Sequence, residues 1–339
     1  MPPRREPRSS SQRSASTSRQ ARKPGWLRPS LPQLSLPSPQ TVGRAALVGL
    51  GAVVGGGLLS LVWREPDRAG VDSFEVTPGS LAEKPARAIT VLVIGLDADK
   101  LGETLNKAAP AGPPNADALL LLRINPKGPL QLLNLPTEVA VNLPGQSRPV
   151  ALGSLYARGG VALTADGVRE LVGLEPPRPD RFLVVPRSAL RTIVDAVGGL
   201  EISPPRVMRY QDKAQKYTID LQSGLQRLDG KQVEQLARFR DPGYGDSGRR
   251  QDHQLIETSL RERLARPEQL LQLPGLLTTL QGQVETNLTG RESLSLLAAG
   301  LDDHRPIQFA TLPLKPAQKE NGGLRQLDLP PDRPVWQAP

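Results

Sequence analysis

A run of 19 uncharged and mostly apolar residues, 45–63, sets the limits on what this chain can fold into. A helix rises about 1.5 Å per residue, so a run of this length crosses the ~30 Å hydrocarbon core of a bilayer. Arg44 and Arg64 bound the run, and Trp63 ends it, where an interfacial aromatic side chain belongs. We therefore predict a transmembrane helix over 45–63. A buried core helix is the alternative, although core helices are rarely so uniformly apolar.

Positive charge is concentrated in the segment that precedes this run. Residues 1–44 hold nine of the 43 Lys and Arg residues and one of the 34 Asp and Glu residues, so they account for most of the net charge of +9. Their Pro, Ser, Arg and Gln content predicts a disordered tail. The positive-inside rule puts this tail in the cytoplasm and the rest of the chain outside.

The cleavage signal of a secretory leader does not directly follow the apolar run, so we expect an uncleaved, single-pass anchor in the cell membrane. The domain beyond the anchor is then extracytoplasmic (periplasmic in a two-membrane envelope). Because that domain is nearly neutral, the sequence argues against nucleic acid as a partner. With no cysteine and two histidines, the chain lacks the residues for disulfides, Fe–S clusters or thiol catalysis, and histidine-based metal sites are disfavoured.

Residues 64–88 are typical of a linker. Beyond them, short continuous apolar runs alternate with segments in which apolar residues recur every three or four positions. Short β-branched or leucine-rich runs predict strands, and spacings of three and four predict helices between them. The expected strands are 89–94, 118–124, 130–135, 181–185, 284–287 and 307–312. The expected helices are 164–172, 187–197, 230–240, 252–264 and 292–301. This alternation predicts one α/β domain over 89–313, with a central mixed β-sheet flanked by helices, followed by an extended tail over 314–339.

Two acidic residues lie at the ends of neighbouring predicted strands. Asp97 follows the first strand, and Asp117 directly precedes the second. If these strands pair antiparallel, the two carboxylates meet at one edge of the sheet. Such a pair suits Mg²⁺ (or Mn²⁺), which binds one or two carboxylates together with substrate phosphates. An acid beside a strand also serves as an ordinary turn or cap residue, and this alternative stays open.

Four arginines follow each other closely later in the chain. Arg238 and Arg240 end a predicted amphipathic helix, and Arg249 and Arg250 follow in a Gly- and Asp-rich loop. A guanidinium matches the oxygens of a phosphate, so a cluster of them predicts a pyrophosphate site. Arginines at a helix C-terminus that complement the helix dipole are the alternative.

Several short motifs of the chain, together with their order along the sequence, resemble those of the LytR–CpsA–Psr (LCP) family of bacterial envelope proteins. The segment 194–202, VDAVGGLEI, is the most specific of them. The others lie in family order at 95–97, 115–117, 134–138, 155–160, 228–230, 238–240 and 246–251.

The resemblance implies a Mg²⁺-dependent phosphotransferase that moves a glycopolymer from a polyprenyl-pyrophosphate carrier to a peptidoglycan acceptor. It implies that Asp97 and Asp117 are catalytic and hold the metal. It also implies that Arg238, Arg240 and Arg249 are catalytic and bind the pyrophosphate. Arg250 and Gln251 are implied as further substrate-binding residues. The alternative is a non-catalytic polyprenyl-phosphate-binding scaffold, or an envelope-related transcriptional attenuator.

The chain also departs from the family pattern. Family arginines are replaced at three positions, by Asp99, Asn115 and Thr137, and a family asparagine is replaced by Gly153. Arg250 and Gln251 align with the family only if two residues are deleted; otherwise Asp252 and His253 occupy those places. His253, at a polar helix start, is expected in solvent. Residues 101–114 are an insertion, which predicts a loop over the site.

Overall fold

The computed structural model describes residues 76–105, 112–213, 217–241, 243–302, 304–316 and 323–328. The predicted tail and transmembrane helix lie outside the described residues, and so does the middle of the predicted loop over the site. The chain divides into Met1–Asp72 and Ser73–Pro339, and all that follows concerns the second unit. Within the ranges that the structure describes, we find no helix that is both long and apolar enough to cross a membrane.

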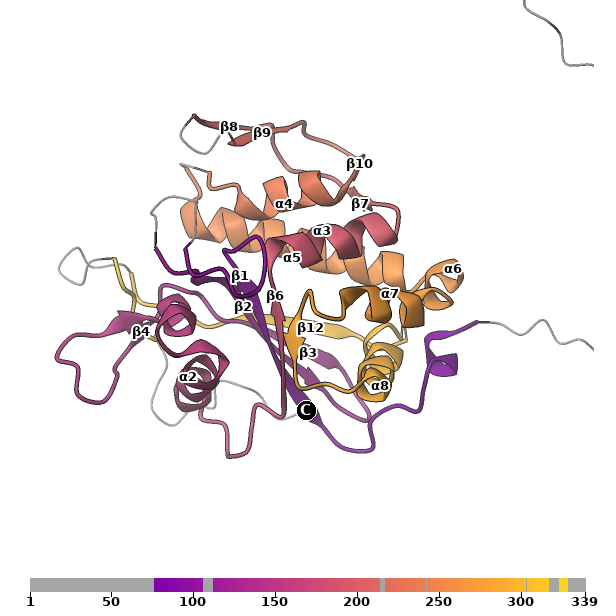
Figure 1. The fold of residues 1–339 in the computed structure, drawn as a ribbon, viewed down its shortest axis with the longest axis horizontal. Helices are drawn as coiled ribbons and strands as arrows, with labels where there is room; N and C mark the ends of the chain where they lie inside the picture. The colour runs from indigo at the N-terminus through magenta and orange to yellow at the C-terminus, as the bar shows by residue number, and fades with distance from the viewer. Residues whose placement is uncertain are drawn as a thin grey trace, which may run out of the picture. The chain divides into compact units, whose positions relative to one another are not determined.

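A six-stranded mixed sheet forms the centre of the second unit, in the order β11-β6-β1-β2-β3-β12 (Figure 1). β1 pairs antiparallel with β2, as β2 does with β3 and β11 with β6, whereas β6 pairs parallel with β1 and β12 parallel with β3. The prediction of a central mixed sheet is confirmed. The strands are β1 (Ile89–Leu96), β2 (Ala116–Ile124), β3 (Leu130–Asn134), β6 (Arg181–Val185), β11 (Glu285–Thr286) and β12 (Ile307–Thr311).

Alternate residues of β1 and β2 face opposite sides of the sheet, and each side is covered by helices. On one side, Leu92, Ile94, Leu119 and Leu121 pack in a core with α2 (Leu155–Val172). On the other side lie α5 (Gly245–Leu264), α7 (Leu273–Leu280) and α8 (Gly290–Gly300). A further core joins α3 (Arg187–Ala196) and α4 (Gly230–Arg238) to α5, so that α5 is shared between this core and the sheet.

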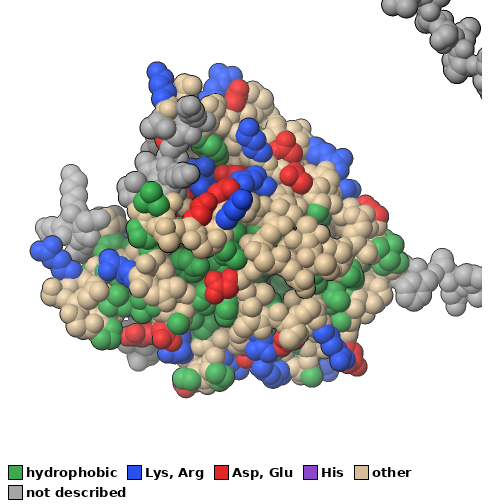
Figure 2. All heavy atoms as spheres, in the orientation of Figure 1, with side chains coloured by type: hydrophobic (Ala, Val, Ile, Leu, Met, Phe, Trp, Pro, Cys, Tyr) green, Lys and Arg blue, Asp and Glu red, His purple; other side chains and the backbone are tan. Residues whose placement is uncertain are grey.

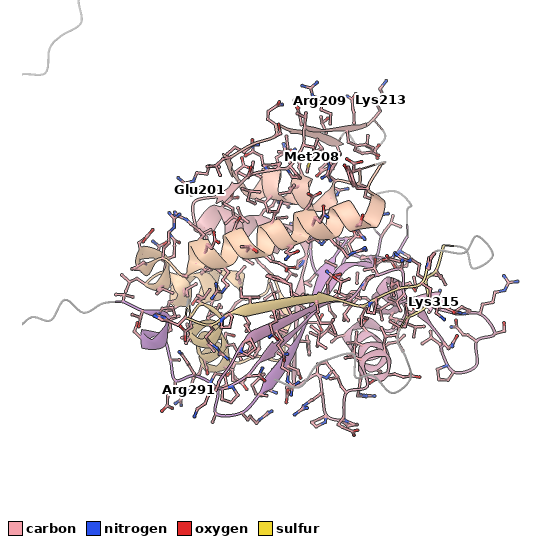
Figure 3. The ribbon with its side chains drawn as sticks, turned by 180° about the vertical axis from the view of Figure 1, so that it is seen from behind. Glu201, Met208, Arg209, Lys213, Arg291 and Lys315 are labelled. Carbon is pink, nitrogen blue, oxygen red and sulfur yellow. The ribbon has the colours of Figure 1, made fainter. Side chains whose placement is uncertain are left out.

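Smaller elements complete the unit. β7 (Leu200–Ile202) pairs with β10 (Gln226–Leu228), β8 (Met208–Asp212) with β9 (Tyr217–Leu221), and β4 (Ala140–Val141) with β5 (Val150–Ala151). The short helices are η1 (Pro78–Ser80), η2 (Leu152–Ser154) and α6 (Pro267–Leu270). Seen from behind, the β8–β9 hairpin, marked by Met208, Arg209 and Lys213, lies beyond α5 from the sheet (Figure 3).

Two predicted helix boundaries were wrong, and both helices start earlier than expected. α2 begins at Leu155 and consists of two helical segments that meet at a kink, where Gly159 and Gly160 have non-helical backbone angles; Gly160 has φ +62°, which favours glycine. α5 begins at Gly245 because the carboxylate of Asp241 accepts the N–H of Gly243 at 2.7 Å and its backbone carbonyl accepts that of Gly245 at 2.8 Å. Arg249 and Arg250 therefore lie on a helix and not in a loop.

Candidate functional site

Asp97 and Asp117 lie at the same edge of the sheet. β1 and β2 are antiparallel neighbours, as the placement of the two acids required, and the register shifts between Gly95 and Leu96. Just beyond this shift, the N–H of Asp97 donates to the carbonyl of Asn115 at 3.0 Å. The sheet thus brings together the two acids that the sequence singled out.

Each of these acids faces a guanidinium. Arg187 Nη1 donates to Asp97 Oδ1 at 3.1 Å, and Arg249 Nη1 lies 3.5 Å from Asp117 Oδ1. Sequence reasoning found Arg249 and missed Arg187, whose one signal was its place at the start of a predicted helix.

No cluster of three or more Asp, Glu or His side chains that could hold a metal ion occurs in the described parts of the chain. Two carboxylates at one edge still fit Mg²⁺, because this ion keeps several water or phosphate oxygens as ligands. The donor set is therefore compatible with the implied metal.

Around Asp117 the side chains enclose a small cavity. It is lined by Thr137, Glu138, Arg249, Arg250 and His253 as well as by Asp117. Arg249 Nη2 donates to Thr137 Oγ1 at 3.4 Å, and Arg250 Nη1 to Glu138 Oε1 at the same distance. Arg249 is buried, although it carries a charge, so its pairing with Asp117 is a structural feature as well as a candidate functional one.

Arg238 and Arg240 lie in different surroundings. Arg238 ends α4, with its guanidinium 4.0 Å from the centre of the Tyr217 ring and Nη1 3.4 Å from Glu234 Oε1. Glu234 also pairs with Arg187 and Arg191, which joins Arg238 to the Asp97 side of the site. Arg240 lies beyond the end of the helix and is exposed, without an ion pair to any other residue that the structure describes. Basic and acidic side chains are interleaved over this end of α4 (Figure 2).

Gln251 and Asp252 follow Arg250 on α5, and Gln251 is exposed. Asp252 is fully buried and pairs with Arg206 at 3.1 Å. Burial raises the pKa of Asp252 to about 6, against the opposing effect of Arg206.

His253 does not lie in solvent, so the expectation from its polar neighbours was wrong. Since α5 starts at Gly245, His253 is inside the helix and turned toward α4, where its ring Nε2 donates to the carbonyl of Ala237 at 2.9 Å. Burial lowers the pKa of His253, and nearby Arg249 lowers it further, whereas the bond to Ala237 and the charge of Asp117 oppose this. His253 is therefore a neutral member of the site at pH 7.

A larger cavity of about 560 Å³ lies between the sheet and helices α5, α7 and α8. Its walls are mostly Leu, Ile and Val side chains, among them Val91 and Val93 of β1. Glu257 and Arg261 of α5 carry ionisable side chains into this lining, and burial raises the pKa of Glu257 to about 7. Sequence reasoning missed Glu257, although an acid close to Ile256 and Leu260 on an apolar helix stripe was a signal.

Fold and site together define an α/β domain with a charged sheet edge and an apolar cavity under one sheet face. The family model described as the LytR_cpsA_psr family matches residues 68–329, and the chain belongs to this family.

Three relatives in sequence are similar over parts of their length. Regulatory protein MsrR of Staphylococcus aureus is 24% identical over 67% of this chain and 65% of its own. The probable cell wall biosynthesis protein LcpB of Corynebacterium glutamicum is 31% identical over 47% of this chain and 37% of its own. For the polyisoprenyl-teichoic acid–peptidoglycan teichoic acid transferase TagU of Enterococcus faecalis the identity is 24%, over 59% of this chain and 61% of TagU. The match thus spans less than two thirds of each relative.

The fold is also that of a solved structure. The crystal structure of TagV from B. subtilis superposes with a TM-score of 0.58 at 19% identity, over 72% of this chain and 92% of TagV. At this identity the likeness concerns the fold alone.

Proposed function

We propose that this protein is a membrane-anchored phosphotransferase that moves a glycopolymer from a polyprenyl-pyrophosphate carrier to peptidoglycan. The observation that carries the proposal is the course of α5. Its first turns bring Arg249 and Arg250 to the charged edge, and its later turns line the apolar cavity from Glu257 to Leu264. One helix thus joins a site for an anionic head group to a site for a hydrocarbon chain. A polyprenyl pyrophosphate has both parts.

The reaction needs little covalent help from the protein. An acceptor hydroxyl attacks the glycan-linked phosphorus and loses its proton to solvent, a new P–O bond forms, and the bond to the carrier phosphate breaks. The carrier leaves as polyprenyl phosphate. Arginines at the charged edge offset the negative charge that spreads over the phosphate oxygens in the transition state. The names of LcpB and TagU, which refer to cell wall biosynthesis and to teichoic acid transfer, support this reaction class.

The metal is part of the proposal. Asp97 and Asp117 would hold Mg²⁺, which would neutralise phosphate charge when bound. Binding can be measured without turnover by the electron paramagnetic resonance of added Mn²⁺, which loses intensity on binding to protein. We expect Asp97→Asn and Asp117→Asn each to weaken Mn²⁺ binding by about tenfold or more, since each removes a ligand charge. Unchanged Mn²⁺ binding in both variants would remove the metal from the proposal.

The transfer itself is tested with purified chain, a polyprenyl-pyrophosphate-linked glycan and a peptidoglycan acceptor. We expect product, or hydrolysis of the pyrophosphate when the acceptor is omitted, and we expect Asp117→Ala to abolish both. Asp166→Ala is the matched control, because Asp166 is an exposed acid on α2 that pairs with Arg169. Full activity in Asp117→Ala would contradict the role of Asp117.

The alternative function is a non-catalytic scaffold that binds polyprenyl phosphate, or an attenuator of transcription. It is favoured by the absence of arginine at Asp99, Asn115 and Thr137. Turnover above background would count against it.

The predicted helix over 45–63 supplies the membrane anchor of the proposal, with residues 1–44 in the cytoplasm and the catalytic domain outside the cell membrane. Accessibility of the domain to protease added to intact spheroplasts tests this topology.

A further inference from the structure

Arg187 is fixed at the charged edge by the backbone around it. The N–H of Arg187 donates to the carbonyl of Ala98 at 2.9 Å, and that of Ser188 donates to Asp99 at 3.0 Å. These two bonds tie the start of α3 to the segment that follows β1. The guanidinium is consequently held beside Asp97, with its side chain 16% exposed.

Part of the guanidinium has no acceptor. Arg187 Nε is buried without a hydrogen bond to any described residue, and Glu234 Oε1, its ion-pair partner, lies 3.8 Å away. The hydroxyl of Tyr217 is buried and unpaired as well, beside Arg238. Buried donors without acceptors are rare in folded proteins. Arg187 Nε, beside Glu234, therefore marks a place where a ligand oxygen can supply the missing acceptor.

The charges around Glu234 are those of an anion site. Arg187, Arg191 and Arg238 all pair with this one carboxylate, which is 8% exposed. Arg191 also pairs with Asp99 at 2.6 Å. Three guanidinium groups that converge on a single two-oxygen acceptor have spare donors for phosphate oxygens.

Helix α3 thus supplies arginines to the side of the site where Asp99 and Asn115 stand. We propose that Arg187 binds the pyrophosphate of the carrier, in place of the guanidinium groups that positions 99 and 115 lack. This inference rests on the proposed function and adds to it a substrate-binding residue that lies outside the family motifs. Arg191 acts through Glu234 and Asp99 as a positioning residue.

The test measures separately how the pyrophosphate head group and the hydrocarbon part of the ligand contribute to binding. The full chain in detergent is titrated with farnesyl pyrophosphate and with farnesol, which have the same hydrocarbon part. We expect wild-type chain to bind the pyrophosphate more tightly than the alcohol. Arg187→Gln should lose about ten- to a hundredfold in affinity for the pyrophosphate, the effect of a missing charge-assisted hydrogen bond, and should bind farnesol as before.

Two further variants complete the experiment. Arg187→Lys keeps the positive charge but lacks the paired N–H donors of the guanidinium, so it should recover part of the affinity for the pyrophosphate. Arg181→Gln is the matched control, because Arg181 also forms a partly buried ion pair, with Glu292, but on β6 away from the site. It should bind both ligands like wild type.

The possible failures are distinguishable. If wild type prefers the pyrophosphate and Arg187→Gln binds it equally well, the inference is wrong while the proposed function stands. If Arg187→Gln and Arg187→Lys lose both ligands alike, Arg187 holds the fold and not the head group, and the inference is again wrong. If wild type binds pyrophosphate and alcohol equally, the proposed function fails and takes the inference with it.

Discussion

The guanidinium of Arg249 lies 3.5 Å from the carboxylate of Asp117, so the first turns of α5 are joined to the start of β2 by opposite charges. The Asp117 side chain is 42% exposed, whereas that of Arg249 is 8% exposed. The acid can therefore accept a further partner from solvent, but the arginine is committed to the protein on most sides. This asymmetry fits the proposed roles of the two side chains at this edge of the sheet, in which Asp117 binds the metal and Arg249 binds phosphate.

Replacement of Arg249 should strongly reduce the turnover rate but change the unfolding free energy only slightly. Arg249→Gln removes the positive charge beside Asp117, and we expect turnover of the pyrophosphate substrate to fall by at least a hundredfold, the scale of losing a preorganised oxyanion contact. Because Asp117 can be solvated instead, the loss in unfolding free energy should be small. Initial rates and urea denaturation on the same preparations measure both. An inactive protein that has also lost its cooperative unfolding would show that Arg249 is needed for the fold.

Glu257 should make the stability of the domain depend on pH. Its pKa is about 7 in the folded protein, above the ordinary value of about 4.3, because burial disfavours the charged form. The folded state then holds more protons than the unfolded state between these two values. The unfolding free energy should fall as pH rises through this window, by roughly 4 kcal/mol at most, and level off above about pH 7.

Glu257→Gln should remove this decline and be more stable than wild type at pH 8. The comparison is made by urea denaturation between pH 4.5 and 8, with Glu262→Gln as the control, since Glu262 is exposed on the same helix. If wild type and Glu257→Gln show parallel pH profiles, the carboxyl of Glu257 is not enclosed in the apolar lining.

Arg206 should stabilise the domain more at high pH than at low pH. It pairs with the fully buried Asp252, whose pKa is raised to about 6, and with Asp241 at 2.7 Å. Arg206→Gln leaves Asp252 as an uncompensated buried charge at pH 8, which costs about 3–5 kcal/mol in unfolding free energy. At pH 5 Asp252 is largely protonated, so the cost should be clearly smaller. Arg209→Gln, which changes an exposed arginine of β8, should have little effect at either pH.

Gly153, where the family has asparagine, should not tolerate a side chain. A Cβ there would lie 2.6 Å from the carbonyl oxygen of Ala116 and 2.8 Å from Cβ of Thr137. Gly153→Ala should therefore lower the unfolding free energy by about 1–3 kcal/mol, the usual cost of overpacking. Gly275→Ala in α7 is the control, because a Cβ at that position has no neighbour within 4 Å. Equal melting temperatures for the two variants would contradict this.

Two of the departures from the family pattern, Thr137 and Gly153, are neighbours in the fold. Thr137 and Gly153 lie against each other, and the N–H of Gly153 donates to the carbonyl of Thr137 at 2.9 Å. The two positions are far apart in sequence but form one contact. A single sequence gives no sign of such a pair, and the geometry was needed to connect them.

The strands and the acid pair could be predicted because they follow from local patterns. Apolar runs marked β1, β2, β3, β6 and β12 to within a few residues, and the antiparallel pairing of β1 with β2 brought Asp97 to Asp117. The starts of α2 and α5 could not be predicted, because they depend on the kink at Gly160 and on the turn at Asp241. Arg187 and Glu234 could not be predicted as residues of the site, because they are placed there by contacts between α3 and α4, which the sequence pattern does not show.

The unbroken course of α5 has a consequence for the size of the ligand. From Arg250 at the charged edge to Glu257 in the lining of the cavity, a helix rises about 10 Å, and a packed helix neither stretches nor shortens. A molecule that occupies both places must span this interval between its phosphates and the part of its chain that meets Glu257. Under the proposed function, α5 would make the domain select its ligand by length as well as by chemistry.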